Sequence, residues 1–159
     1  VKPDNNVYVT VVNICGLKGG NILETIINNT SLDIPFLLVD SQEADCDLNK
    51  RLKKLLIDRN LVEKPHKSVY IRGPIADMKN IYQQTRLLLT PSLVDESFCR
   101  VAYEDMMNNI PILSTNYTSF FIFTFSSQIT QGEGVFPALY IFTKYSITSF
   151  LNSSTTFST

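Results

Sequence analysis

The stretch Tyr8-Val-Thr-Val-Val-Asn-Ile-Cys-Gly-Leu-Lys-Gly-Gly20 decides the fold that we expect for this chain. It begins with an apolar run, Tyr8 to Val12, that has the length of a strand buried in a parallel sheet. A glycine-rich turn follows, and after Gly20 the apolar residues recur at helical spacing. This order of a buried strand, a tight turn and an amphipathic helix predicts a βαβ unit.

The same alternation continues to about residue 116. Further short apolar runs lie at Phe36 to Val39, Val69 to Ile71, Leu87 to Leu89 and Ile110 to Leu113. Helical patterns separate them, after Gly20, after Asp47, from Met78 to Gln84 and from Ser97. Because crossovers between parallel strands are right-handed, this order predicts a Rossmann-like α/β fold, with a parallel sheet and helices on both faces. Ligands of such sheets bind beyond the carboxyl ends of the strands, so the turns after the strands are the candidate sites.

The helix predicted after Asp47 has two clearly different faces. We expect Asp47 to cap it. Its apolar face holds Leu48, Leu52, Leu55 and Leu56. Its charged face holds Lys50, Lys53, Lys54 and Asp58.

Composition and charge exclude several classes of protein. The net charge is -1, from 14 Lys and Arg against 15 Asp and Glu, so we expect no nucleic-acid binding by bulk electrostatics. The cysteines are odd in number and form no C-x-x-C, which favours a cytoplasmic setting over a disulfide framework or a zinc ribbon. No apolar run has the length of a transmembrane segment. The chain opens at Val1 without an apolar signal, and we interpret that start as a fragment boundary.

The composition changes near residue 117. From there to residue 159 the only charged residues are Glu133 and Lys144, and Ser, Thr and Phe are frequent. We therefore divide the chain into a domain at 1–116 and a divergent tail at 117–159, whose structure the sequence does not indicate.

The turn after the first strand is a candidate phosphate site. It leads into a helix, whose free N–H groups attract anions, and Lys18 adds a full positive charge. The turn is neither a G-x-G-x-x-G nor a P-loop, because Lys18 precedes the glycine pair. The alternative is an ordinary glycine-rich turn with a solvated lysine.

The turn after Leu89 carries two carboxylates, Glu96 and Glu104, on either side of the predicted helix start. Eight helical residues span roughly 12 Å. That is about the distance from the sugar hydroxyls to the ribose hydroxyls of a nucleotide sugar whose diphosphate lies at the helix N-terminus. The alternative is that Glu96 is a first-turn acid and Glu104 a solvated mid-helix residue.

Several segments occur in the order and spacing of one known family. They are Lys18-Gly19, Ile71-Arg-Gly-Pro-Ile-Ala-Asp-Met78, Tyr82 to Ser92, Glu96-Ser-Phe-Cys-Arg-Val-Ala-Tyr-Glu104 and Met106-Met-Asn-Asn-Ile-Pro-Ile112. Together they resemble the donor-binding domain of family 4 retaining glycosyltransferases. The resemblance covers about Tyr8 to Asn116.

The resemblance implies a role for each matching residue. Glu96 would hold the hydroxyls of the donor sugar, and Glu104 would hold the ribose. Lys18, next to Gly19, would neutralise the departing diphosphate. Amides around Phe98, Cys99 and Arg100 would face the sugar and the phosphates, and the loop of Gly73, Pro74 and Ile75 would lie beside the base.

The resemblance also implies the whole reaction. It indicates one half of a two-domain glycosyltransferase fold, whose N-terminal acceptor domain is missing here. The enzyme would be of the hexosyltransferase type, moving a sugar from a nucleotide-diphosphate sugar to an unidentified acceptor with retention, without metal or cofactor. We expect the chain alone to bind donor weakly and to lack turnover. The alternative is a non-catalytic remnant or a nucleotide-binding module.

The sequence departs from the family pattern at specific positions. Asn13 stands where the family usually has Arg, although some relatives also have Asn. Cys99 stands where the family has Gly, which adds a side chain near the donor sugar. The resemblance ends at Asn116, before the Gly-rich turn and acidic residue that follow in the family.

Three residues support weaker alternatives. Asp40 ends its strand where dinucleotide folds bind ribose, which suggests a nicotinamide-dependent oxidoreductase, but G-x-G-x-x-G is absent. We interpret His66 as a solvated loop residue and Cys15 as an inert thiol, because neither has a catalytic partner in the sequence.

Overall fold

The computed structural model describes residues 6–41, 46–94, 100–115 and 139–142. The strands are β1 (Tyr8–Val12), β2 (Phe36–Asp40), β3 (Val69–Arg72), β4 (Thr85–Thr90), β5 (Ile112–Thr115) and β6 (Leu139–Phe142). The helices are α1 (Gly20–Asn29), α2 (Asp47–Arg59), α3 (Lys79–Gln84) and α4 (Arg100–Met107). The strands form one sheet in the order β3-β2-β1-β4-β5-β6, and every pair is parallel. The Rossmann-like α/β fold is therefore confirmed.

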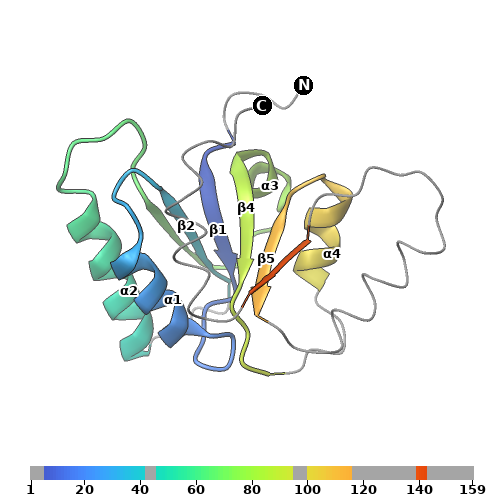
Figure 1. The fold of residues 1–159 in the computed structure, drawn as a ribbon, viewed down its shortest axis with the longest axis horizontal. Helices are drawn as coiled ribbons and strands as arrows, with labels where there is room; N and C mark the ends of the chain where they lie inside the picture. Colours follow the sequence, from blue (N-terminus) through green and yellow to red (C-terminus); the bar gives the residue numbers. More distant parts are fainter. Residues whose placement is uncertain (1–5, 42–45, 95–99, 116–138, 143–159) are drawn as a thin grey trace.

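Helices cover both faces of the sheet. In Figure 1, α1 and α2 lie on one side of it, and α3 and α4 lie on the other. Alternate strand residues point to opposite faces, so Phe36 and Leu38 pack with α1 and α2, while Leu37 and Val39 pack with α3. The leucines predicted for the apolar face of α2 contribute to the first of these cores, as expected.

Two predicted strand boundaries and one cap are wrong. β4 begins at Thr85, whose buried hydroxyl bonds that of Thr10 on β1 at 2.8 Å, so polar pairing extends the strand beyond its apolar run. β5 begins at Ile112, because Pro111 has no N–H to give to the sheet and the N–H of Ile110 bonds the Asp105 carbonyl. Asp47 is the first residue of α2 rather than its cap, which is Cys46.

The sixth strand comes from the tail at 117–159, whose structure the sequence did not indicate. β6 pairs in parallel with β5, with Leu139 opposite Ile112. The boundary at residue 116 lies outside the described residues, so the division into 1–116 and 117–159 stays a prediction.

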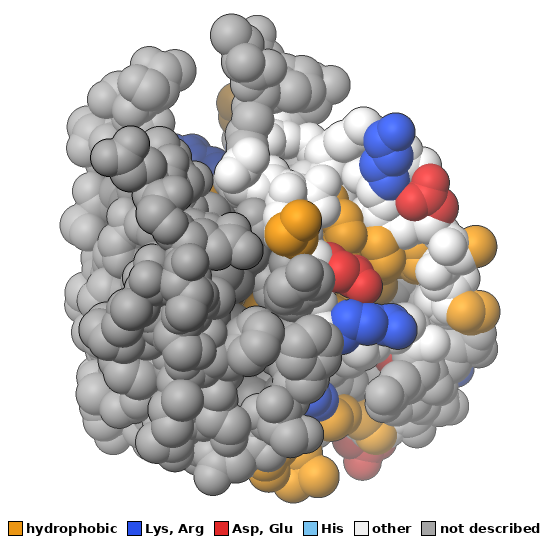
Figure 2. Space-filling model, turned by 90° about the vertical axis from the view of Figure 1, so that its right-hand side faces the viewer, with side chains coloured by type: hydrophobic (Ala, Val, Ile, Leu, Met, Phe, Trp, Pro, Cys, Tyr) orange, Lys and Arg blue, Asp and Glu red, His pale blue; other side chains and the backbone are white. Residues whose placement is uncertain are grey.

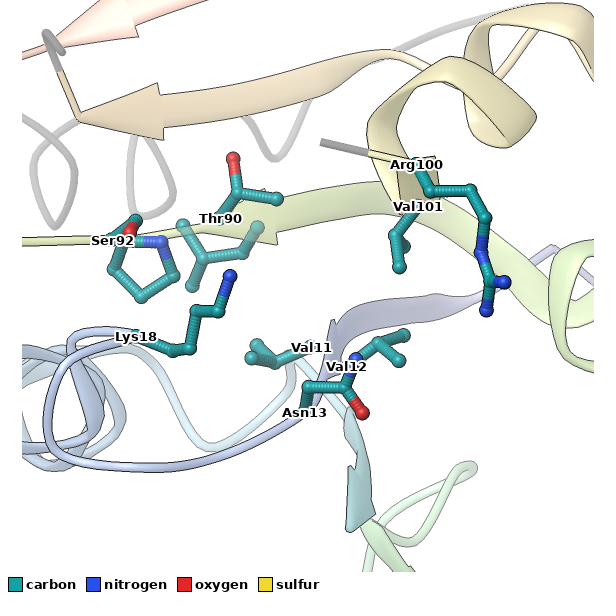
Figure 3. Close-up of a pocket in the computed structure, with 10 residues that line it drawn as sticks. Val11, Val12, Asn13, Lys18, Thr90, Ser92, Arg100 and Val101 are labelled. Atoms are coloured by element: carbon teal, nitrogen blue, oxygen red, sulfur yellow. The ribbon is translucent and has the colours of Figure 1, made fainter. Parts of the chain in front are cut away.

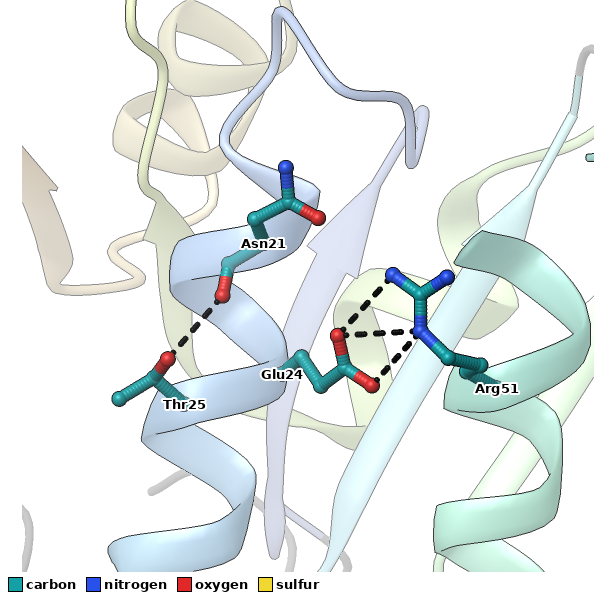
Figure 4. Close-up of polar contacts among 4 residues, drawn as sticks. All are labelled: Asn21, Glu24, Thr25 and Arg51. Atoms are coloured by element: carbon teal, nitrogen blue, oxygen red, sulfur yellow. Dashed lines mark hydrogen bonds and ion pairs between the residues drawn. The ribbon is translucent and has the colours of Figure 1, made fainter. Parts of the chain in front are cut away.

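Arginines join α1 to α2. The buried Arg59 donates hydrogen bonds to the carbonyls of Ile27, Thr30, Ser31 and Ile34, which satisfies the carboxyl end of α1. Burial lowers the pKa of Arg59. On the surface, Arg51 of α2 pairs with Glu24 of α1, with Nε 3.0 Å from Oε1 (Figure 4). None of the described helices has the length and apolar character needed to cross a bilayer.

Candidate functional site

The sheet order reverses between β1 and β4. The connections from these two strands lead to opposite faces of the sheet, so their carboxyl ends open a crevice. A pocket of about 360 Å³ lies there. Its walls come from the end of β1, the β1–α1 turn, the end of β4 and the described start of α4. The pocket therefore lies where the sequence predicted a ligand site, beyond the ends of two neighbouring strands.

A close backbone contact holds the two turns together. Gly19 has φ 77°, in the left-handed region, and a Cβ there would lie 1.8 Å from the Pro91 carbonyl oxygen. Only glycine fits that approach. The N–H of Leu93 also donates to the Leu17 carbonyl at 3.0 Å. Gly19 itself is not among the residues that line the pocket, but it fixes the turn that carries Lys18.

Two cations line this pocket. In Figure 3, Lys18 extends from the β1–α1 turn on one side, and Arg100 extends from α4 on the other. The apolar side chains of Val11, Val12 and Val101 form part of the wall between them. Apolar walls lower the local dielectric and strengthen charge interactions. The arrangement suits an anionic ligand with an apolar or planar part.

Asn13 takes part in the same wall. It follows β1 directly and has φ 61°, a conformation that asparagine tolerates better than most residues. Its N–H donates to the Val39 carbonyl at 2.9 Å, and its side-chain oxygen accepts a hydrogen bond from the Ser41 hydroxyl. Asn13, which stands where the resemblance led us to expect Arg, therefore lines the pocket with a neutral side chain.

Glu104 lies beside the pocket rather than in its wall. Its Oε2 accepts a hydrogen bond from the Tyr82 hydroxyl of α3, and its Oε1 lies 3.4 Å from Nε of Arg100. Its side chain is 36% exposed, so it is neither buried nor freely solvated. The interpretation of Glu104 as a simply solvated residue does not fit these contacts.

The other predicted site residues have different outcomes. Glu96, Phe98 and Cys99 lie outside the described residues, so their roles stay predictions. The loop of Gly73, Pro74 and Ile75 follows β3 at the edge of the described sheet and does not line the pocket. Gly73 has φ 109° and its N–H donates to the Asp40 carbonyl at 3.0 Å, which keeps the loop against β2.

Asp40 belongs to a closed cluster. It is 1% exposed, and its Oδ2 accepts hydrogen bonds from Asn49 at 2.8 Å and from the Tyr70 hydroxyl at 3.0 Å. Burial, and then the hydrogen bond to Asp40, raise the pKa of Tyr70. A ribose could not reach this carboxylate without displacing those partners, which removes the structural basis of the nicotinamide alternative.

The remaining candidates are unremarkable in geometry. His66 is exposed and Cys15 is half-buried. Within the described part of the chain, no group of three or more His, Cys, Asp or Glu side chains could hold a metal ion. On the side of the molecule seen in Figure 2, described acidic and basic side chains lie next to one another among hydrophobic ones, and neither charge forms a continuous area.

Comparisons with known proteins identify a shared fold. No protein-family model matches the chain, and no curated protein matches its sequence. Crystal structures of Anabaena HepE do match: the complex with UDP-glucose at a TM-score of 0.65 and 17% identity, and the complex with UDP and glucose at 0.66 and 18%. These alignments cover 94% and 96% of this chain but only 39% of the HepE chain. The chain thus has the Rossmann-like fold of part of a protein that was crystallised with a nucleotide sugar.

Proposed function

We propose that this chain is the donor-binding part of a retaining glycosyltransferase resembling family 4, and that its ligand is a nucleotide-diphosphate hexose. The observation that carries the proposal is the pocket between β1 and β4, which Lys18 and Arg100 line from opposite sides. Its position at the reversal of strand order is the usual ligand position in such sheets. The match to HepE, a protein crystallised with UDP-glucose, supports the same ligand class.

The two cations suit a diphosphate. Negative charge grows on the diphosphate as the sugar leaves, and fixed cations beside it stabilise that charge most at the transition state. Lys18 is placed by a turn that Gly19 and Pro91 hold rigidly, so little reorganisation is needed when the charge develops. We assign Lys18 the neutralisation of the leaving diphosphate, and Glu96 the binding of the sugar hydroxyls.

Nucleotide recognition would come from the residues around the pocket. Glu104 would accept hydrogen bonds from the ribose, and Gly73, Pro74 and Ile75 would lie beside the base, as in the family. Backbone amides of Phe98, Cys99 and Arg100 would face the sugar and the phosphates. We propose that the reaction needs no metal or cofactor and that a separate N-terminal domain supplies the acceptor. Cytoplasmic location stays a prediction from the cysteine pattern.

Calorimetric titration of the full chain with UDP-glucose tests the proposal. We expect weak but saturable binding, with a Kd of about 1 mM, because the separate N-terminal domain would contribute the other half of the cleft. Glu104→Ala should weaken binding about tenfold, while the control Glu63→Ala, in an exposed segment away from the pocket, should leave it unchanged. Glucose alone should not saturate the chain. A wild-type chain without saturable binding would contradict the proposal.

The second candidate is a nucleotide-binding module without turnover. Asn13 favours it, since a neutral side chain in the pocket wall replaces the family Arg and removes one cation from the phosphate site. Asn13→Arg distinguishes the two. If the pocket is built for a diphosphate, the added cation should tighten UDP-glucose binding severalfold, and the gain should fall with increasing salt.

A further inference from the structure

Tyr82 connects the interior of the fold to the edge of the candidate site. It lies in α3, is 8% exposed, and packs with Leu88 of β4, Ala102 of α4 and Ile112 of β5. The ring therefore packs against α4 and against the strands β4 and β5. Its hydroxyl emerges from this core and donates to Oε2 of Glu104, which is 22 residues away in the chain.

The second oxygen of the same carboxylate lies near Arg100. Oε1 of Glu104 lies 3.4 Å from Nε of Arg100, whose side chain lines the pocket. Glu104 thus lies between a rigid donor in the core and a cation at the pocket. Arg100 is 80% exposed, so its contact with Glu104 is screened by solvent, whereas the bond from the buried Tyr82 is protected.

A glutamate side chain at a half-exposed helix position has many rotamers, and ordering it on ligand binding costs free energy. A hydrogen bond from a packed tyrosine ring removes most of that freedom before the ligand arrives. A carboxylate accepts about four hydrogen bonds, so Tyr82 leaves acceptor positions for hydroxyl groups of a ligand.

On the basis of the function proposed above, we propose that Tyr82 is a positioning residue. It holds the Glu104 carboxylate in place, so that this carboxylate can accept hydrogen bonds from the ribose hydroxyls of the nucleotide. Tyr82 itself touches no ligand, and it acts through Glu104.

The protonation of Tyr82 agrees with this role. Burial is the main cause that raises its pKa above the ordinary value, and the hydrogen bond to Glu104 adds to the shift. The hydroxyl therefore keeps its proton, and donates it to Glu104, throughout the range in which a nucleotide would be bound.

The chain contains a matched control. Tyr70 also donates its hydroxyl to a carboxylate, that of Asp40, but Asp40 is enclosed and neither residue lines the pocket. Tyr70→Phe removes the same chemical group and the same type of bond as Tyr82→Phe. A difference between the two variants in ligand binding is therefore due to location.

The experiment compares UDP with 2′,3′-dideoxy-UDP, which lacks both ribose hydroxyls, by NMR titration of the full chain. Tyr82→Phe should weaken UDP binding about fivefold to tenfold and leave dideoxy-UDP binding unchanged. Tyr70→Phe should change neither. Far-UV circular dichroism of each variant checks that the fold is retained.

A double variant gives a second readout. If Tyr82 acts through Glu104, adding Tyr82→Phe to Glu104→Ala should cause no further loss of UDP binding. An equal loss for both nucleotides in Tyr82→Phe, or a further loss in the double variant, would overturn the inference, since either result indicates a general effect on the fold. A wild-type chain that binds neither nucleotide overturns the proposed function as well, whereas normal wild-type binding without a selective loss overturns the inference alone.

Discussion

Two tyrosine–carboxylate pairs lie on different sides of this sheet, and they differ in what surrounds them. Asp40 and Tyr70 join β2 to β3, and the carboxylate is 1% exposed with Asn49 as a further partner. Glu104 and Tyr82 join α4 to α3, and the carboxylate is 36% exposed beside a pocket that contains two cations. The same pair of groups is enclosed by the fold in one place and lies at the edge of a pocket in the other.

The difference shows that a hydrogen-bonded carboxylate is not by itself a sign of function. The two pairs differ in whether solvent, and therefore a ligand, can reach the carboxylate. Asp40 is buried and its Oδ2 accepts hydrogen bonds from two protein donors, whereas Glu104 retains an exposed part next to Arg100. The predictions below test this contrast.

The largest effect is expected at Gly19, because its backbone contact with Pro91 holds together the two turns beside the pocket. Gly19→Val places a side chain on a left-handed residue and against the Pro91 carbonyl, so it should lower the free energy of unfolding by about 3 kcal/mol or more and open the pocket. Gly16→Ala is the control, because nothing lies within 4 Å of its added Cβ, and it should change stability by less than about 0.5 kcal/mol. Urea denaturation measures both. Equal stability of the two variants would show that the turns are not held by this contact.

A substitution in the Asp40–Tyr70 pair should lower stability and leave ligand binding unchanged. Asp40→Ala leaves the Asn49 amide and the Tyr70 hydroxyl without their shared acceptor, so the free energy of unfolding should fall by about 2 to 4 kcal/mol. The affinity of the folded protein for UDP-glucose should stay the same. Asp58→Ala, on the exposed face of α2, serves as the control. A large loss of affinity in Asp40→Ala at conditions where the variant is folded would mean that Asp40 belongs to the site after all.

A substitution in the pocket wall should instead affect binding and not stability. Lys18→Ala should weaken UDP-glucose binding about tenfold, because a cation in the pocket wall is lost, and should leave the unfolding transition nearly unchanged. Lys53→Ala on α2 removes the same charge from an exposed helix face and should leave binding intact. Calorimetry at two salt concentrations measures the effect, which should shrink as salt rises. An identical salt dependence in wild type and Lys18→Ala would contradict the assignment.

The smallest effect concerns pH. The pKa of Tyr82 in the folded protein is raised above its unfolded value of about 10, chiefly by burial. The folded state therefore keeps a proton that the unfolded chain loses, so the contribution is fully present below pH 10 and is lost as pH rises above it. Between pH 10 and 11 the wild type should lose about 1 kcal/mol more stability than Tyr82→Phe. Superimposable pH profiles of the two proteins would show that the hydroxyl is not buried.

Much of the fold could be predicted because its signals are local. The apolar runs from Tyr8 to Val12 and from Phe36 to Val39 became β1 and β2 with little change. The errors came from contacts between distant segments or from a single residue: Thr85 joined its strand through Thr10, and Pro111 delayed the start of β5. The pairing of β6 with β5 depends on a partner strand, which no pattern within 117–159 reveals.

The site was predicted in part. Lys18 and Arg100 both line one pocket, whereas the predicted role of the Arg100 amide stays a prediction. Tyr82 lies inside a segment that the resemblance singled out, but nothing in the sequence indicated its bond to Glu104. A buried tyrosine looks like a core residue until the group that its hydroxyl reaches is known.

By itself the sequence determined the alternation of strands and helices, the turns that could carry a site and the resemblance to one family, since periodicity and turn chemistry depend on neighbours in the chain. Only the tertiary structure decided which carboxylate is closed and which is open, because the packing of α3 against α4 and the contact of α2 with β2 set the exposure of each. Burial and hydrogen-bond partners are properties of segments that meet in space, so residues of the same type acquired different roles.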